Sequence, residues 1–139
     1  MKKILILLVV FLVTIIFIYW HYGIDRKGMM VTYKDILKVT APRANETVKS
    51  SLMVRGEARG NWYFEASFPV RLLDGNNHEI SKTVAHAEGE WMTNNFVPFS
   101  ATLQFETPTT PEGTLVLEKD NPSGLPQNAD EFRIPIRFK

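Results

Sequence analysis

The stretch Phe64-Glu65-Ala66-Ser67-Phe68-Pro69-Val70-Arg71-Leu72 sets the fold class. Apolar side chains occupy every second position in it, and most of the positions between them are polar. A β-strand places successive side chains on opposite faces of its sheet, so this period of two predicts a half-buried strand. The same period recurs over residues 97–105 and 132–138. A helix would instead distribute these apolar side chains around its whole circumference.

Residues 35–139 divide into about seven such runs. Turn-forming residues separate them, most clearly in Asp74-Gly75-Asn76-Asn77 and in residues 120–126. The expected strands are 36–40, 51–58, 63–73, 79–87, 96–106, 113–119 and 132–138. Seven short strands in a region of this length predict an all-β fold, an immunoglobulin-like β-sandwich. Its core is expected to contain Phe64, Phe68, Val70, Phe99, Leu103, Ile134 and Ile136.

The N-terminal segment is the most apolar part of the chain. Fourteen of the fifteen residues from Ile4 to Ile18 are Ile, Leu, Val or Phe. As a helix, residues 4–20 would be about 26 Å long, close to the thickness of a bilayer's hydrocarbon core. Tyr19, Trp20 and Tyr22 would lie at the interface, where aromatic residues are enriched. The sequence therefore predicts one N-terminal transmembrane helix that binds the membrane through residues 4–20.

This segment is either a retained anchor or a signal peptide that is removed. Cleavage sites need small residues, but the first alanine is Ala41, and bulky His21 precedes the weak candidate Gly23. We therefore expect an uncleaved anchor over residues 1–22, a tether over residues 23–34 and a β-sandwich domain over residues 35–139. Basic residues flank the apolar run on both sides, so charge alone does not choose its orientation.

Composition excludes several classes of function. Without residues 1–20, the chain has 14 basic and 15 acidic residues, a net charge of −1, so no nucleic acid is expected as a partner. The chain has no cysteine, which rules out disulfides, thiolate nucleophiles and cysteine metal sites. Its three histidines are scattered, and no glycine-rich phosphate loop or G-x-S-x-G motif occurs. We expect no metal, no cofactor and no enzyme activity.

Three groups of residues point to a known family. They are Gly60-Asn61-Trp62-Tyr63-Phe64-Glu65-Ala66-Ser67-Phe68-Pro69-Val70, then Glu90-Trp91-Met92-Thr93 with Phe96-Val97-Pro98-Phe99, and Leu117-Glu118-Lys119-Asp120-Asn121-Pro122-Ser123-Gly124. In this order they resemble the bacterial spore germination immunoglobulin-like domain family, over about residues 36–139. The resemblance implies a non-catalytic sandwich on the extracytoplasmic side of a bacterial cytoplasmic membrane. It implies neither a germination role nor a defined set of ligand-binding residues.

Five residues are candidates for binding. Trp91 lies in a polar, glycine-containing stretch, where it could anchor a protein or a glycan or could cap the core. Trp62 opens the clearest strand and could bind a partner or fill the core. Asp120, Asn121 and Ser123 belong to a loop with two prolines and a glycine. Such a loop could be ordered by its own polar side chains, or it could form a binding rim near Trp91.

Three functions follow from these features. The first is an envelope protein-interaction or adhesion module held at the membrane by residues 4–20. The second is a module that binds carbohydrate, such as peptidoglycan or another cell-wall glycan, which Trp91 and its polar neighbours would suit. The third is a hydrolase that uses paired carboxylates. The third is disfavoured, because nothing in the sequence places two of Glu65, Glu88, Glu90 and Glu118 in one cleft.

Overall fold

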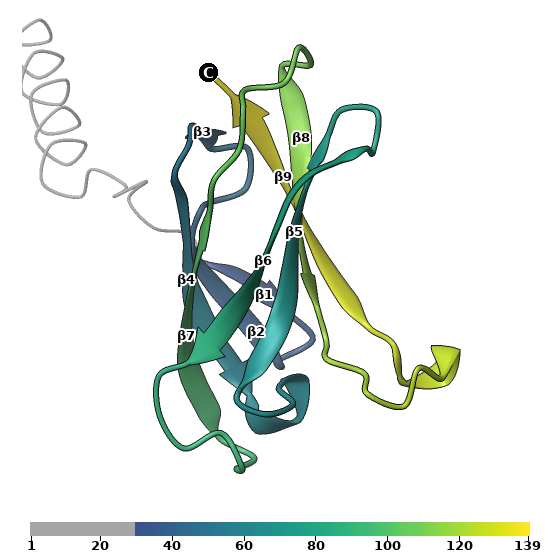
Figure 1. Ribbon diagram of the computed structural model, residues 1–139. Helices are drawn as coiled ribbons and strands as arrows, with labels where there is room; N and C mark the ends of the chain where they lie inside the picture. Colours follow the sequence, from purple (N-terminus) through teal and green to yellow (C-terminus); the bar gives the residue numbers. More distant parts are fainter. Residues whose placement is uncertain (1–29) are drawn as a thin grey trace, which may run out of the picture.

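The computed structural model describes residues 30–139, which form an all-β domain (Figure 1). In chain order the strands are β1 (Val31–Tyr33), β2 (Leu37–Ala41), β3 (Thr47–Val48), β4 (Leu52–Arg59), β5 (Ser67–Asp74), β6 (Glu79–Ala87), β7 (Phe96–Leu103), β8 (Glu112–Glu118) and β9 (Glu131–Phe138). Two one-turn 3₁₀ helices, η1 (Gly60–Trp62) and η2 (Pro126–Asn128), interrupt the connections. The expected anchor over residues 1–22 lies outside the described residues. Within residues 30–139, no helix has the length and apolarity needed to cross a membrane.

All nine strands belong to one curled sheet, in the order β1-β2-β4-β7-β6-β5-β8-β9-β3. Strand β6 makes the curl, because it pairs with β5 along most of its length and with β7 only at His86 and Ala87. The sheet therefore folds over into two layers, with β1, β2, β4 and β7 in one and the remaining strands in the other (Figure 1). This arrangement agrees with the expected sandwich, although two of its strands were not expected.

Alternating side chains build the core between the layers. Along β4 and β7 buried residues alternate with more exposed ones, as the period of two predicted. Phe68 and Phe99, both essentially inaccessible, meet edge to face with ring centroids 4.9 Å apart. The expected core residues other than Phe64 are all buried: Phe68, Val70, Phe99, Leu103, Ile134 and Ile136.

Phe64 is the exception, and its predicted burial is wrong: 42% of it is exposed. The strand expected from residue 63 begins instead at Ser67. Glu65 and Ala66 have left-handed backbone angles, φ +49° and +61°, and Phe64 and Ser67 exchange backbone hydrogen bonds across this turn. The turn ends the alternation, so Phe64 points outward although it continues the apolar pattern of β5.

The two unexpected strands are short. Strand β1 pairs antiparallel with β2, and β3 pairs in parallel with the end of β9. Residues 31–33 were expected to belong to the tether over residues 23–34, but they form β1 and so belong to the folded domain. Neither strand exceeds three residues, which is too short for an alternating pattern to be recognised.

Candidate functional site

Four connections meet at one end of the sandwich, the lower end in Figure 1. They are residues 34–36, 60–66, 88–95 and 119–130, and together we call them the loop end. Direct contacts join them. The backbone N–H of Asp120 donates to the carbonyl of Trp62 over 3.1 Å. Arg59, at the end of β4, bridges two other connections, because its Nη1 donates to the carbonyl of Asn94 over 2.9 Å and its Nη2 to the carboxylate of Asp35 over 2.7 Å.

Gly60 lets two of these connections approach each other. A Cβ at this position would lie 2.0 Å from the carbonyl oxygen of Thr93 and 2.2 Å from that of Trp91. Both atoms belong to the backbone, which cannot move aside as a flexible side chain could. A residue without a side chain is therefore required here, and it holds residues 60–66 against residues 88–95.

Trp62 lies beneath the loop end. It is 1% exposed, and its ring meets those of Tyr33 and Phe68 edge to face at centroid distances of 6.1 and 6.5 Å. Its indole N–H has no hydrogen-bond partner among the described residues. This burial favours the core interpretation of Trp62, since an inaccessible ring cannot contact a partner directly.

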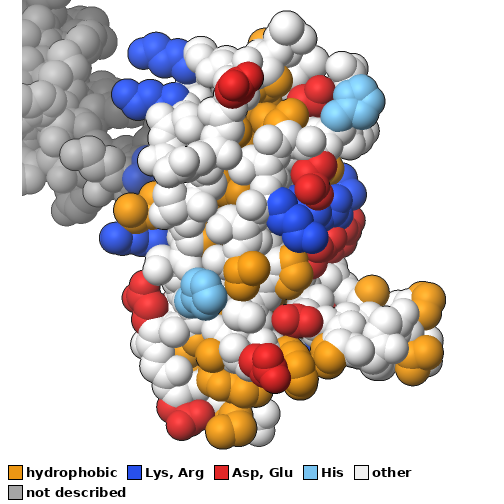
Figure 2. Space-filling view, viewed as in Figure 1, with side chains coloured by type: hydrophobic (Ala, Val, Ile, Leu, Met, Phe, Trp, Pro, Cys, Tyr) orange, Lys and Arg blue, Asp and Glu red, His pale blue; other side chains and the backbone are white. Residues whose placement is uncertain are grey.

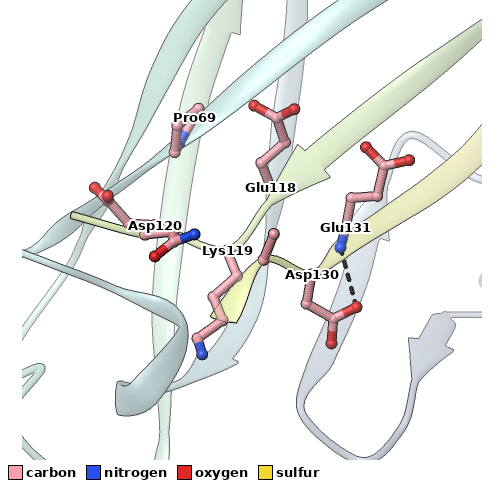
Figure 3. A pocket seen from close by; sticks show the side chains of 8 residues that line it. Pro69, Glu118, Lys119, Asp120, Asp130 and Glu131 are labelled. Carbon is pink, nitrogen blue, oxygen red and sulfur yellow. Dashed lines mark hydrogen bonds between the residues drawn. The ribbon is translucent and has the colours of Figure 1, made fainter. Parts of the chain in front are cut away.

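A cavity of about 550 Å³ opens beside the 119–130 connection (Figure 3). Its walls come from β5, from the end of β8, from the start of β9 and from the connection itself. The lining residues are Pro69, Glu118, Lys119, Asp120, Asn121, Ala129, Asp130 and Glu131. Glu118 and Glu131 are paired neighbours on β8 and β9, so their side chains point to the same side (Figure 3).

Cations hold most of the carboxylates around this cavity. Nη2 of Arg71 lies 2.6 Å from a carboxylate oxygen of Glu118 and 3.8 Å from one of Glu131. The hydrogen bond to Glu118 raises the pKa of Arg71 and outweighs the opposing effect of burial. Asp120 differs from its neighbours, because within residues 30–139 its carboxylate has no ion-pair partner.

The carboxylate of Asp130 is held by Tyr33 of β1 and by Lys34, the residue that follows it. The hydroxyl of Tyr33 donates to its carboxylate over 2.7 Å, and Nζ of Lys34 lies 3.3 Å away. Burial by itself raises the pKa of Asp130, but the hydrogen bonds from Tyr33 and Lys34, together with the charge of Lys34, lower it below its usual value. The ring of Tyr33 also stacks on Phe132, with centroids 5.0 Å apart.

The 119–130 connection is shaped by its own hydrogen bonds. The side-chain amide of Asn121 donates to the carbonyl of Leu125 over 2.9 Å, and that of Asn128 donates to Oγ of Ser123 over 3.0 Å. Gly124, with φ +65°, closes a turn by donating to the carbonyl of Asn121. An ordered polar loop was one of the two interpretations of this stretch, and these bonds support it.

The structure therefore brings together some of the predicted site residues and separates others. Asp120 and Asn121 line the cavity, whereas Ser123 lies further along the same connection and bonds to Asn121. Trp91 does not line the cavity, since it is half-buried and packs against the core. Its neighbour Met92 is 74% exposed. Within residues 30–139, no three acidic or histidine side chains are grouped so that they could hold a metal ion.

Sequence reasoning did not identify Pro69, Asp130 and Glu131 as part of the site. No local signal marks them, because they meet Asp120 only through the pairing of β5, β8 and β9. Sequence reasoning also missed Met92 as an exposed side chain. Here a signal existed, since a large apolar residue within a polar stretch is unusual for a loop that only connects two strands.

Comparison with known proteins gives one match. A family model described as an immunoglobulin-like domain of bacterial spore germination matches residues 36–125, which is more than half of the chain. The match ends before β9, although β9 pairs with β8 at seven successive positions. No curated protein and no solved structure matches the chain.

Proposed function

The chain belongs to the immunoglobulin-like domain family of bacterial spore germination, and from this membership we propose that it is a non-catalytic interaction module of the bacterial cell envelope. In this proposal, residues 4–20 hold the protein in the cytoplasmic membrane, and the β domain lies on the extracytoplasmic side. There it binds another envelope protein. A role in germination is not part of the proposal.

The observation that carries the proposal is the preformed cavity at the loop end. Asp120 and Asn121 line it, and hydrogen bonds within residues 119–130 fix the shape of its wall before any partner arrives. A preorganised loop loses less conformational entropy on binding than a flexible loop does. Binding sites also tend to lie on loops that a rigid scaffold supports.

Two features favour a protein partner over a glycan. None of the eight described lining residues is aromatic, so the cavity offers no flat ring on which a sugar could stack. Phe64, Met92 and Leu125 are exposed in three connections of the loop end, and such side chains suit a protein interface. Carbohydrate binding remains the second candidate, because part of Trp91 is accessible beside polar neighbours.

The ion pairs and hydrogen bonds of the carboxylates at the loop end disfavour catalysis. Glu118 is engaged by Arg71, and Asp130 by Tyr33 and Lys34. Hydrolysis of a glycosidic bond needs one carboxyl group that gives up a proton and a second one that attacks or activates water. Tyr33 and Lys34 lower the pKa of Asp130, which makes this carboxyl group a poor proton donor, and Glu118 already accepts hydrogen bonds from Arg71.

The test compares two preparations from a bacterial envelope with the full chain. Detergent-solubilised membrane proteins are passed over the immobilised full chain, and purified cell wall is sedimented with the full chain in detergent micelles. We expect retention of a membrane protein that Asp120→Ala with Asn121→Ala weakens, and no sedimentation with cell wall. Glu106→Ala with Thr107→Ala, a pair in the 104–111 connection at the opposite end, is the matched control. Sedimentation without protein retention would favour the glycan candidate.

The membrane arrangement has its own test. A reporter enzyme that is active only in the cytoplasm is fused after Lys139, and we expect it to be inactive. Sequencing of the mature N-terminus should find it intact. An active reporter, or a mature chain that begins near Gly23, would contradict the proposed anchoring.

A further inference from the structure

Exposed apolar side chains gather at the loop end. Six large hydrophobic residues are exposed in the described part of the chain, and three of them lie in loop-end connections. These are Phe64 at 42%, Met92 at 74% and Leu125 at 48% exposure, each in a different connection. The connections at the opposite end, which cover residues 42–46, 49–51, 75–78 and 104–111, contain none of the six.

The formal charge also differs between the loop end and the opposite end of the sandwich. The four loop-end connections contain six acidic residues (Asp35, Glu65, Glu88, Glu90, Asp120 and Asp130) and two basic ones, Lys34 and Lys119, which gives a formal charge of −4. The opposite-end connections contain two acidic and two basic residues, so they are neutral. Orange and red side chains lie among white atoms at the lower end of the face in Figure 2.

Few of these acidic groups are neutralised internally. Asp35 pairs with Arg59, and Asp130 pairs with Lys34. Within residues 30–139, Glu65, Glu88 and Asp120 have no ion-pair partner, and the carboxylate of Glu90 caps the backbone N–H of Met92. The exposed apolar side chains are therefore set among negative charges that remain available to a partner.

Strand β1 runs from Val31 to Tyr33 toward the loop end, so its first residue is the one farther from the loop end. If residues 4–20 anchor the chain as proposed, this direction favours a loop end that faces away from the membrane. An acidic surface is also repelled by anionic lipids, which attract basic segments. Both features argue that the apolar side chains of the loop end serve a partner other than the bilayer.

We propose that the loop end is a docking surface for a basic polypeptide segment that carries apolar side chains. This inference rests on the proposed function, because it assigns the partner's chemistry to the same end of the domain. Lysine or arginine side chains of the partner would pair with Glu65, Glu88 and Asp120, while its apolar side chains cover Phe64, Met92 and Leu125. Complementary charge speeds the encounter and selects the partner, and the apolar contacts hold the complex.

Defined peptides test the proposal on the full chain in nanodiscs of zwitterionic phosphatidylcholine. The probe is a fluorescent, soluble Gly/Ser peptide that carries several lysines and leucines. In one comparison peptide glutamate replaces lysine, and in another serine replaces leucine. Fluorescence anisotropy measures each affinity, with empty nanodiscs as the blank. We expect both changes to weaken binding by about tenfold or more.

Matched variants of the protein locate the surface. Phe64→Ser, Met92→Ser and Leu125→Ser combined should weaken binding of the Lys/Leu peptide by about tenfold. Met53→Ser removes a hydrophobic side chain that is 48% exposed near the start of β4, away from the loop end, and it should change the affinity by less than about twofold. Glu65→Gln with Glu88→Gln should weaken binding, whereas Glu106→Gln with Glu112→Gln should not.

Any of three results would overturn the proposal. The first is equal binding of the Lys/Leu and Glu/Leu peptides. The second is an equal loss of affinity in the loop-end and control variants. The third is increased hydrogen-exchange protection of residues 60–66, 88–95 and 119–130 when phosphatidylglycerol replaces phosphatidylcholine, which would place the loop end against lipid. Retention of an envelope protein in the separate pull-down would leave the proposed function standing in each case.

Discussion

Tyr33 provides the sharpest test of how the domain is held together. It belongs to β1, which the sequence had assigned to the tether, yet it makes three contacts with other parts of the domain. Its hydroxyl donates to Asp130 over 2.7 Å, its ring stacks on Phe132, and it meets the ring of Trp62 edge to face. If these contacts matter, replacing Tyr33 should destabilise the whole domain and not only its first strand.

The contacts of Tyr33 determine how much unfolding free energy each substitution should remove. A hydrogen bond to a charged group contributes about 1.5–3 kcal/mol. Asp130 keeps its bond to Lys34 and is part-exposed, so Tyr33→Phe should lower the free energy of unfolding by about 1–2 kcal/mol. Tyr33→Ala also removes a half-buried ring with two aromatic neighbours, so its total loss should be about 3–4 kcal/mol.

Urea denaturation of the full chain in detergent micelles, monitored by tryptophan emission, measures the loss of unfolding free energy in both variants. Thr32→Ala is the control, because this exposed neighbour on the same strand should change stability by less than about 0.5 kcal/mol. If Tyr33→Ala unfolds at the same urea concentration as the unaltered chain, β1 does not belong to the cooperative unit. If Tyr33→Phe loses as much as Tyr33→Ala, the hydrogen bond and not the ring carries the effect.

Three further predictions concern the core and the site. Phe68→Ala, which empties an inaccessible position, should cost about 3–5 kcal/mol in the same denaturation assay. Gly56→Ala should cost about 3 kcal/mol or more, because the new Cβ would lie 2.1 Å from the carbonyl oxygen of Lys38 and 2.7 Å from the ring of Phe99. The lowered pKa of Asp130 stabilises the fold above the unfolded-state pKa near about 4. That contribution should be lost as pH falls through the folded-state pKa, so denaturation between about pH 5 and 2 should depend less on pH in Asp130→Asn than in the unaltered chain.

Strands were predictable wherever the alternation is long. The strand expected over residues 79–87 coincides with β6, the one expected over 51–58 is shifted by one residue from β4, and the one expected over 132–138 begins one residue after β9 does. In β4 and β9, one face meets the core and the other meets solvent, so the side-chain pattern records the burial directly. Short strands such as β1 and β3 carry no such record, because two or three residues are too few to show an alternation, and the partner of β3, strand β9, is also distant in sequence.

Phe64 illustrates a different limit. The alternation that identifies β5 extends through Phe64 without a break in the sequence. The break lies in the backbone, since Glu65 and Ala66 adopt left-handed angles. Glycine and asparagine mark such positions in sequences, whereas glutamate and alanine do not. The turn is imposed by the contacts on either side of it, among them the hydrogen bond from Ala87 to the carbonyl of Ala66.

Only the residues of the candidate site that lie within the 119–130 connection could be predicted from the sequence. Asp120 and Asn121 could be identified because their loop has its own turn chemistry. Pro69 and Glu131 complete the cavity through strand register, which depends on how the whole sheet assembles. Trp91 looked like a surface anchor by composition, but its packing against the core depends on the close approach of Gly60.

Trp62 determines which substitutions can separate binding from folding. It lies beneath the loop end, and its carbonyl holds the 119–130 connection through Asp120. Replacing Trp62 or Gly60 would therefore change stability and loop geometry together, and a loss of binding would have no single cause. Phe64, Met92 and Leu125 already contact solvent in the folded domain, so replacing them should cost about 1 kcal/mol or less each. A loss of binding in those variants can be assigned to the surface itself.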